Sequence, residues 1–152
     1  MTDATALCTG DTVYIALGSN LGDRAAHLAA ARLALDALPG TSIIALSDVE
    51  ETAPIGPAGQ GPYLNQVVAM HTSIEPVPLL GHLHDIERSR GRVRLERWGA
   101  RTLDLDIVCY GGRHISEPDL VVPHPELPNR DFWQREMTQA ATRIGAAPAG
   151  RP

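Results

Sequence analysis

The sequence predicts an α+β fold, a ferredoxin-like βαββαβ sandwich with an added small hairpin. Short apolar runs of strand length alternate with two longer runs whose leucines recur at helical spacing. Glycine and proline separate these runs and mark the turns. The order of the runs is the ferredoxin-like supersecondary pattern. Such a sheet carries both helices on one face, so we expect the other face to stay open.

The first half of this pattern is a strand, a helix and a second strand, over residues 13–17, 24–38 and 41–49. The turn at 19–23 can cap the helix. The helix itself is rich in alanine and leucine and stops at Pro39-Gly40. These signals together place the first helix directly after the first strand.

The second half is a strand, a helix and a strand, over residues 63–72, 75–90 and 103–110. Two loops interrupt it. Residues 51–62 contain three prolines and three glycines, and residues 91–102 are rich in arginine. After the last strand, Gly111-Gly112 predicts a turn, and we expect residues 113–122 to add the small hairpin.

Composition excludes several classes of protein. A chain of 152 residues is one domain by length, and its net charge of −5 argues against broad binding to nucleic acid. No stretch approaches the roughly eighteen apolar residues of a membrane span. All thirteen basic residues are arginine, which excludes a P-loop lysine or a Schiff-base lysine. Cys8 and Cys109 match neither a metal motif nor a disulfide framework, so we expect two separate thiols and a reducing cytoplasm.

Two carboxylates stand two residues apart in the last predicted strand. Asp104 and Asp106 should therefore point to one face, while the other face carries Leu103, Leu105, Ile107 and Cys109 toward the core. Aligned carboxylates repel each other unless a cation lies between them, and hard oxygen ligands with open positions suit Mg²⁺ that phosphate also holds. The pair alone could equally be a solvated, salt-bridged sheet face.

Six arginines fall within the fourteen residues 88–101, opposed there only by Glu96. Guanidinium groups bind phosphate oxygens in a bidentate manner, so this cluster suits a phosphorylated substrate. The arginines of the cluster are Arg88, Arg90, Arg92, Arg94, Arg97 and Arg101.

Taken in order, six segments resemble the 6-hydroxymethyl-7,8-dihydropterin pyrophosphokinase family of folate biosynthesis. They are YIALGSNLGDR (14–24), ETAPIGPAGQGPYLNQVV (51–68), IE (86–87), GRVR (91–94), RWGARTLDLDIV (97–108) and VPHPELPNRDF (122–132). The resemblance implies transfer of the β,γ-diphosphate of ATP to the hydroxymethyl group of the pterin, leaving AMP. A catalytically inactive MgATP-binding module of the same fold is the alternative. An RNA-binding domain of this fold would need aromatic residues and basic charge on the sheet face, where this chain has aspartates.

The family roles fall on particular residues of this chain. Asp104 and Asp106 match the ligands of two Mg²⁺ ions that bridge the ATP phosphates. Arg92 and Arg101 match catalytic-loop arginines, which would stabilise charge on the transferred group. The residues that match the nucleotide site are Glu87, Arg94, Trp98, Ile107, His124 and Arg130, with His84 close by. For Glu87, an ion pair with Arg90 on the helix surface is an equal alternative.

The pterin site is implied in the same way. Asn65 could give a donor and an acceptor to the pyrimidine edge of the ring. Tyr63 and Phe132 match two aromatic residues that sandwich it. Thr52, Pro54 and Ile55 match residues that line the same slot.

The resemblance also divides the chain. We expect a flexible leader over residues 1–10, the pyrophosphokinase domain over 11–132 and a divergent C-terminal segment over 133–152. The last twenty residues are polar or small, so we expect them to have little to bury. The expected partners are two small molecules, ATP and the pterin, with no nucleic acid and no membrane. We expect a monomer.

Overall fold

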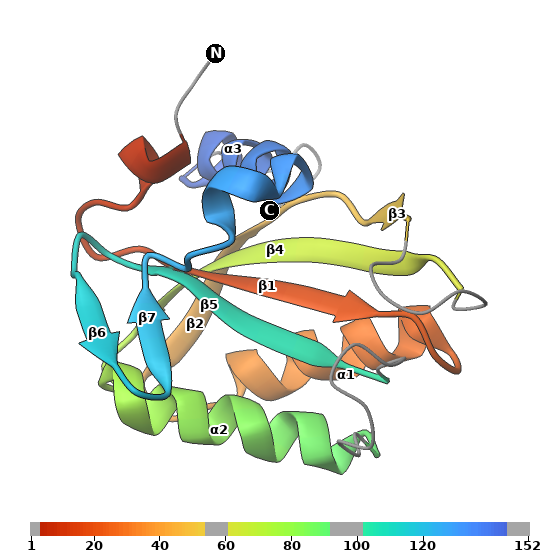
Figure 1. The fold of residues 1–152 in the computed structure, drawn as a ribbon. Helices are drawn as coiled ribbons and strands as arrows, with labels where there is room; N and C mark the ends of the chain where they lie inside the picture. Colours follow the sequence, from red (N-terminus) through yellow and green to blue (C-terminus); the bar gives the residue numbers. More distant parts are fainter. Residues whose placement is uncertain (1–3, 54–60, 92–101, 146–152) are drawn as a thin grey trace.

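The described part of the chain folds as a mixed α/β arrangement of one five-stranded antiparallel sheet, a two-stranded hairpin and three helices (Figure 1). It is seen in a computed structural model that describes residues 4–53, 61–91 and 102–145. Its strands are β1 Val13–Ser19, β2 Thr41–Leu46, β3 Glu50–Thr52, β4 Tyr63–Thr72, β5 Asp104–Tyr110, β6 Ile115–Glu117 and β7 Leu120–Val122. Its helices are α1 Arg24–Asp36, α2 Pro76–Ser89 and α3 Asp131–Arg143, with 3₁₀ turns η1 Ala4–Leu7 and η2 Leu127–Asn129. The predicted α+β class is confirmed.

The strands of the large sheet lie in the order β2-β4-β1-β5, and β3 pairs with the start of β4. The sequence predicted one continuous strand over 41–49, which is wrong. β2 ends at Leu46 because Ser47 turns its polar groups onto β4: its backbone N–H donates to Val67 O, and its hydroxyl accepts the N–H of Val67. The chain then forms β3, which pairs with the other end of β4.

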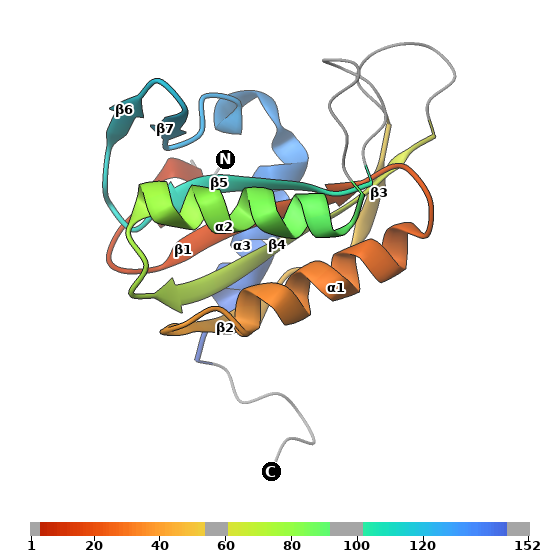
Figure 2. The ribbon, with the colours of Figure 1, turned by 90° about the horizontal axis from the view of Figure 1, so that it is seen from below.

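Helices α1 and α2 cover one face of the sheet, as the pattern predicted (Figure 2). Alternate residues of β1, among them Ile15 and Leu17, pack there against Leu28 and Leu35 of α1 and Leu83 of α2. Asp23 caps α1, because its carboxylate accepts the N–H of Ala26 at 3.1 Å.

The opposite face is not open, and this part of the prediction is wrong. Helix α3 lies across it (Figure 1), and Trp133 and Met137 are buried there against Tyr14 and Val67 of the sheet. Each such side chain contributes about 1.5–3 kcal/mol by burial. The expectation that the chain after Phe132 has little to bury is therefore wrong for the described residues 133–145.

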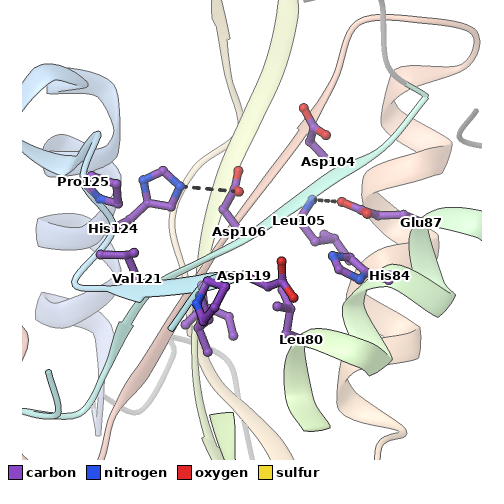
Figure 3. A pocket seen from close by; sticks show the side chains of 13 residues that line it. Leu80, His84, Glu87, Asp104, Leu105, Asp106, Asp119, Val121, His124 and Pro125 are labelled. Atoms are coloured by element: carbon purple, nitrogen blue, oxygen red, sulfur yellow. Dashed lines mark hydrogen bonds and ion pairs between the residues drawn. The ribbon is translucent and has the colours of Figure 1, made fainter. Parts of the chain in front are cut away.

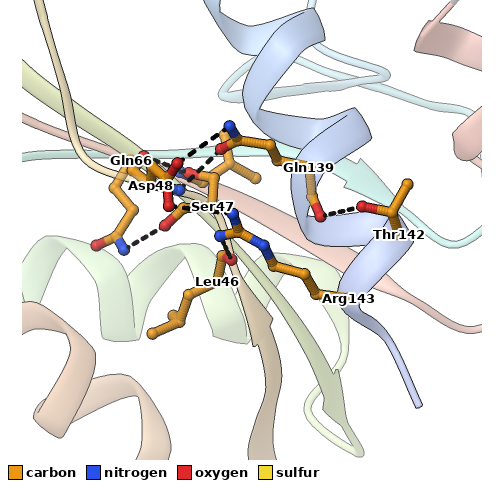
Figure 4. A network of polar contacts seen from close by, with 8 residues as sticks. Leu46, Ser47, Asp48, Gln66, Gln139, Thr142 and Arg143 are labelled. Carbon is orange, nitrogen blue, oxygen red and sulfur yellow. Dashed lines mark hydrogen bonds and ion pairs between the residues drawn. The ribbon is translucent and has the colours of Figure 1, made fainter. Parts of the chain in front are cut away.

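A polar network fastens the end of α3 to the segment after β2 (Figure 4). Asp48 donates its N–H to Gln139 Oε1 at 2.8 Å, and its carboxylate pairs with Arg143 at 3.1 Å. Arg143 also donates to Leu46 O at 2.9 Å. These contacts join segments that are far apart in the sequence, so they fix where α3 lies on the sheet.

The register of β1 and β5 shifts between Tyr14 and Ile15, which leaves Val108 as an extra residue in β5. Leu105 and Ile107 face α2 as predicted, but Cys109 lies on the α3 face, so the prediction for Cys109 is wrong. There it forms a disulfide with Cys8, with 5.4 Å between the two Cα atoms. The expectation of two separate thiols is therefore also wrong.

The disulfide brings the segment after η1 onto the sheet, and η1 itself lies against α3. Among the described residues, no helix is long and apolar enough to cross a membrane.

Candidate active site

One row of four residues crosses the α3 face of the sheet. Register pairs Glu50 with Asn65, Asn65 with Gly18, and Gly18 with Asp104. Residues paired across antiparallel strands point to the same face, so all four share one surface. Strands lie about 4.8 Å apart, which puts the backbones of Asn65 and Asp104 roughly 10 Å from each other. The sheet thus sets the predicted pterin residue and a predicted metal ligand side by side.

Gly18 keeps this surface open between the two. A Cβ atom at this position would lie 3.3 Å from Asn65 Oδ1 and 3.4 Å from Cδ1 of Tyr63. Such contacts are tighter than normal packing, so any larger residue would push both side chains aside. The hydrogen atom of glycine leaves both side chains in place.

Asp104 and Asp106 lie on one face of β5, as predicted, and both are partly exposed. Figure 3 shows them projecting from the strand beside Glu87 of α2 and His124. No group of three or more His, Cys, Asp or Glu that could hold a metal occurs within residues 4–53, 61–91 and 102–145. Two partly exposed carboxylates on one face suit a hard cation that also binds the oxygens of a substrate.

His124 is held in a defined orientation across from Asp106. Its backbone N–H donates to Val108 O at 2.8 Å, and its Nδ1 accepts the N–H of Glu126 at 3.0 Å. The edge of the ring meets Trp133, with 4.9 Å between centroids. Because Nδ1 is an acceptor, the proton of the neutral ring is on Nε2, which lies 3.7 Å from Asp106 Oδ1. His124 therefore presents a donor on the side of the carboxylates.

A cavity of about 320 Å³ opens beside these groups, within the size range of small-molecule sites. The predicted nucleotide residues Glu87, Ile107 and His124 line it, together with His84. The wall opposite β5 comes from the hairpin of β6 and β7 and includes Asp119, which the sequence analysis missed. The hairpin was predicted, but nothing in its sequence indicated that it would face the carboxylates.

Glu87 is a buried residue, not a surface one. It is 4% exposed, and its carboxylate accepts the N–H of Leu105 at 2.8 Å. The alternative of an ion pair on the helix surface is therefore wrong, and Arg90 instead donates to Nδ1 of His27. Glu87 ties α2 to the strand residue between the two aspartates.

Three of the predicted pterin residues, Asn65, Thr52 and Tyr63, lie together at the opposite end of the row. Asn65 is 6% exposed, and its amide donates to Thr52 Oγ1 on β3. Tyr63 is the register partner of Thr52, so it lies on the same face. Phe132 is half-buried in the first turn of α3, 6.3 Å from the ring of Trp133.

One predicted nucleotide residue lies elsewhere. The guanidinium of Arg130 stacks over Trp133 at 4.5 Å and does not line the cavity. Six further predicted residues lie outside the described residues: Arg92, Arg94, Trp98, Arg101, Pro54 and Ile55.

Comparisons with known proteins identify the family of this chain. Residues 14–142 match the model of the family described as 7,8-dihydro-6-hydroxymethylpterin-pyrophosphokinase. A 2-amino-4-hydroxy-6-hydroxymethyldihydropteridine pyrophosphokinase of Haemophilus influenzae is 45% identical over 121 residues, 80% of this chain and 76% of the relative. Enzymes of the same name from Pseudomonas aeruginosa and Bacillus subtilis are 44% and 41% identical, over 79% and 86% of this chain and 74% and 78% of their own lengths.

The match over residues 14–142 therefore defines the class, a pyrophosphoryl-transferring enzyme that uses ATP. The chain belongs to the 7,8-dihydro-6-hydroxymethylpterin-pyrophosphokinase family. The activity predicted from the sequence, pyrophosphoryl transfer from ATP to hydroxymethyldihydropterin, is confirmed at the level of the family.

Proposed function

We propose that this chain transfers the β,γ-diphosphate of ATP to the hydroxymethyl oxygen of 6-hydroxymethyl-7,8-dihydropterin across the row from Asn65 to Asp104. The observation that carries the proposal is the register, which sets Asn65, Gly18 and Asp104 side by side on one face. A flat bicyclic ring bound by one edge at Asn65 reaches toward Asp104 with its other edge. The alcohol is then delivered to the phosphates.

Asp104 and Asp106 are the proposed ligands of two Mg²⁺ ions. Their hard oxygens, partial exposure and shared face fit a cation that also binds phosphate. Magnesium bound there would neutralise the triphosphate and lower the proton affinity of the alcohol. Glu87 supports this arrangement, because its carboxylate accepts the N–H of Leu105. This hydrogen bond fixes the backbone of β5 at the residue between Asp104 and Asp106.

The proposed nucleotide site is the cavity between β5 and the β6–β7 hairpin, lined by Glu87, Ile107 and His124. The proton on Nε2 lets His124 donate to a phosphate oxygen. From the family resemblance, Arg92 and Arg101 are proposed to stabilise charge on the transferred group. Arg94, Trp98 and Arg130 remain proposed nucleotide residues on the same basis.

At the pterin end, Asn65 is the proposed reader of the pyrimidine edge. The hydrogen bond from its amide to Thr52 fixes the orientation of the group before substrate arrives. Tyr63 and Phe132 are proposed to stack on the two faces of the ring, and Pro54 and Ile55 to line the slot.

Three broader expectations belong to the same proposal. The strand order β2-β4-β1-β5, with α1 and α2 on one face, supports a ferredoxin-like arrangement for the core. We further propose that the protein acts as a monomer and in the cytoplasm. The domain itself is proposed to span residues 11–132, preceded by a leader and followed by a divergent segment.

The direct test mixes the purified chain with ATP, Mg²⁺ and 6-hydroxymethyl-7,8-dihydropterin and measures AMP with and without the pterin. Pterin-dependent AMP release is the expected result. An inactive module of the same fold would bind MgATP but release no AMP, and that outcome would refute the proposal.

A further inference from the structure

Arg24 is a charged residue at the start of α1 that the proposed reaction does not use. Its guanidinium donates from Nη1 to the backbone carbonyl oxygen of Pro62 at 2.8 Å. Its Nη2 lies 3.6 Å from Oε2 of Glu51, and the Arg24 side chain is mostly buried. A planar guanidinium with several donors can hold two acceptors at once in a fixed geometry. Arg24 thus joins two segments that are separate in the chain.

Both contacts lie directly beside proposed pterin residues. Pro62 immediately precedes Tyr63, with which β4 begins. Glu51 immediately precedes Thr52, the last residue of β3. Tyr63 and Thr52 are register partners across the two strands. Arg24 therefore holds the chain one residue before each member of this pair.

Arg24 acts from the side of the sheet that α1 covers, opposite to the proposed pterin residues. Successive residues of a strand point to opposite faces, so Glu51 points away from the face that carries Thr52. Its register partner Leu64 packs against the core between the sheet and the helices α1 and α2, which agrees with this orientation. Arg24 is therefore not placed to contact a ring on the Thr52 face, and any effect on the substrate passes through the backbone.

A second contact from the same turn holds the chain just before β4. The side-chain amide of Asn20 is buried and donates to the carbonyl oxygen of Gly61 at 3.4 Å. Together with the bond from Arg24, the turn before α1 thus binds two consecutive carbonyl groups. Asp23 caps α1, so the start of this helix is itself fixed. The chain that enters Tyr63 is therefore held against a rigid element.

We propose that Arg24 is a positioning residue for the pterin site, which fixes the backbones of β3 and β4 next to Thr52 and Tyr63. This inference rests on the proposed pterin site. Thr52 in turn accepts the hydrogen bond that orients the amide of Asn65. Both contacts of the guanidinium are at this end of the sheet, whereas the proposed metal ligands lie on β5. A site that is ordered before binding loses less entropy when the ligand arrives, so loss of Arg24 should weaken pterin binding and spare ATP binding.

The test compares Arg24→Met, which keeps much of the side chain but removes every donor, with Arg24→Lys, which keeps a charged donor. Arg113→Met is the matched control, because Arg113 also makes a partly exposed ion pair, with Glu75 at 3.2 Å, beyond the end of β5 that is farthest from Asp104. We expect Arg24→Met to raise the KM for the pterin about fivefold and to leave kcat and the KM for ATP within about twofold. Arg24→Lys and Arg113→Met should keep the pterin KM within about twofold of wild type.

Glu51→Lys covers the case in which Arg24→Met fails to fold. The side chain of Glu51 is 56% exposed, so the substitution places a second positive charge beside Arg24 without disturbing the core. Repulsion should displace the guanidinium from Pro62 and raise the pterin KM about threefold, with the KM for ATP unchanged. Glu51→Gln removes the ion pair alone and should leave the pterin KM within about twofold.

Two results would overturn the role of Arg24. One is an unchanged pterin KM in Arg24→Met, or in Glu51→Lys where Arg24→Met does not fold. The other is an equal rise of the KM values for pterin and ATP, which a general loss of structure would produce. Either result leaves the proposed function intact as long as the wild type releases AMP only with the pterin. A wild type without pterin-dependent AMP release refutes the proposed function, and this inference with it.

Discussion

Replacement of Gly18 by alanine tests the row across the sheet most directly. The new Cβ would lie 3.3 Å from Asn65 Oδ1 and 3.4 Å from the ring of Tyr63, so both side chains must move by a few tenths of an ångström. The amide of Asn65 cannot move without straining its hydrogen bond to Thr52. Weakening one or two hydrogen bonds to the pterin by this shift costs about 0.5–1.5 kcal/mol. The expected result is a pterin KM that rises roughly three- to tenfold.

The free energy of unfolding of Gly18→Ala should rise slightly or stay unchanged. Gly18 has no left-handed backbone conformation that would oppose a side chain, and alanine is favoured over glycine within a strand by about 0.5–1 kcal/mol. Gly81→Ala in α2 is the matched control, because a Cβ there meets nothing within 4 Å. It should stabilise the helix by a similar amount and leave both KM values unchanged.

The assay is steady-state AMP release with one substrate varied at a time, alongside thermal unfolding of each variant. We expect a selective effect: the KM for the pterin rises, the KM for ATP stays within twofold and the Tm does not fall. If Gly18→Ala leaves the pterin KM unchanged, or raises the KM for ATP instead, the pterin does not lie beside Asn65 and the row does not join the two substrates.

Four further predictions follow from the same contacts. Asp106→Asn should lower Mg²⁺-dependent turnover by at least about a hundredfold with little change in Tm, and a near-normal rate at any Mg²⁺ concentration would contradict the metal assignment. Asn65→Ala should weaken pterin binding, measured by calorimetry, while ATP binding is kept; the reverse pattern would exclude the pterin assignment. Glu87→Ala should lower the free energy of unfolding in urea by about 1–3 kcal/mol, because the N–H of Leu105 loses its acceptor, and an unchanged urea midpoint would contradict this. Glu136 has a pKa raised from 4.5 to about 10, so it keeps its proton in the folded chain where the unfolded chain has lost it; stability should fall as pH rises through this interval, and Glu136→Gln should flatten the dependence measured by urea unfolding.

The sequence predicted the face of β5 that carries Asp104 and Asp106 better than the rest of the strand, for a physical reason. Alternation with a period of two holds as long as every residue has a register partner, and it placed Asp104 and Asp106 together. It fails beyond Val108, because a bulge reverses the faces of the residues that follow. Cys109 therefore reaches the α3 face, where it meets Cys8. A bulge within a run of apolar residues cannot be recognised from the sequence, because the residues on both faces are apolar.

Helix α3 was missed because its composition is misleading. Its exposed side carries charged and polar residues, so the whole segment reads as polar. Its buried stripe is short, with Trp133, Met137 and Ala140 at helical spacing. The placement of the proposed pterin and metal residues on the sheet also depends on pairing between strands that are far apart in the sequence. Nothing local to Asn65 or Asp104 indicates that Gly18 lies between them.

The position of α3 has a consequence for how the two ends of the site are supported. Trp133 makes an edge-on contact with the ring of His124, which faces the carboxylates, and the preceding residue of the same helix is Phe132, a proposed stacking residue for the pterin. One rigid element therefore supports both proposed substrate sites. The network from Asp48 to Gln139 and Arg143 sets the position of that helix on the sheet. A change at Arg143 should then alter both KM values together, in contrast to Gly18, which acts on the pterin alone.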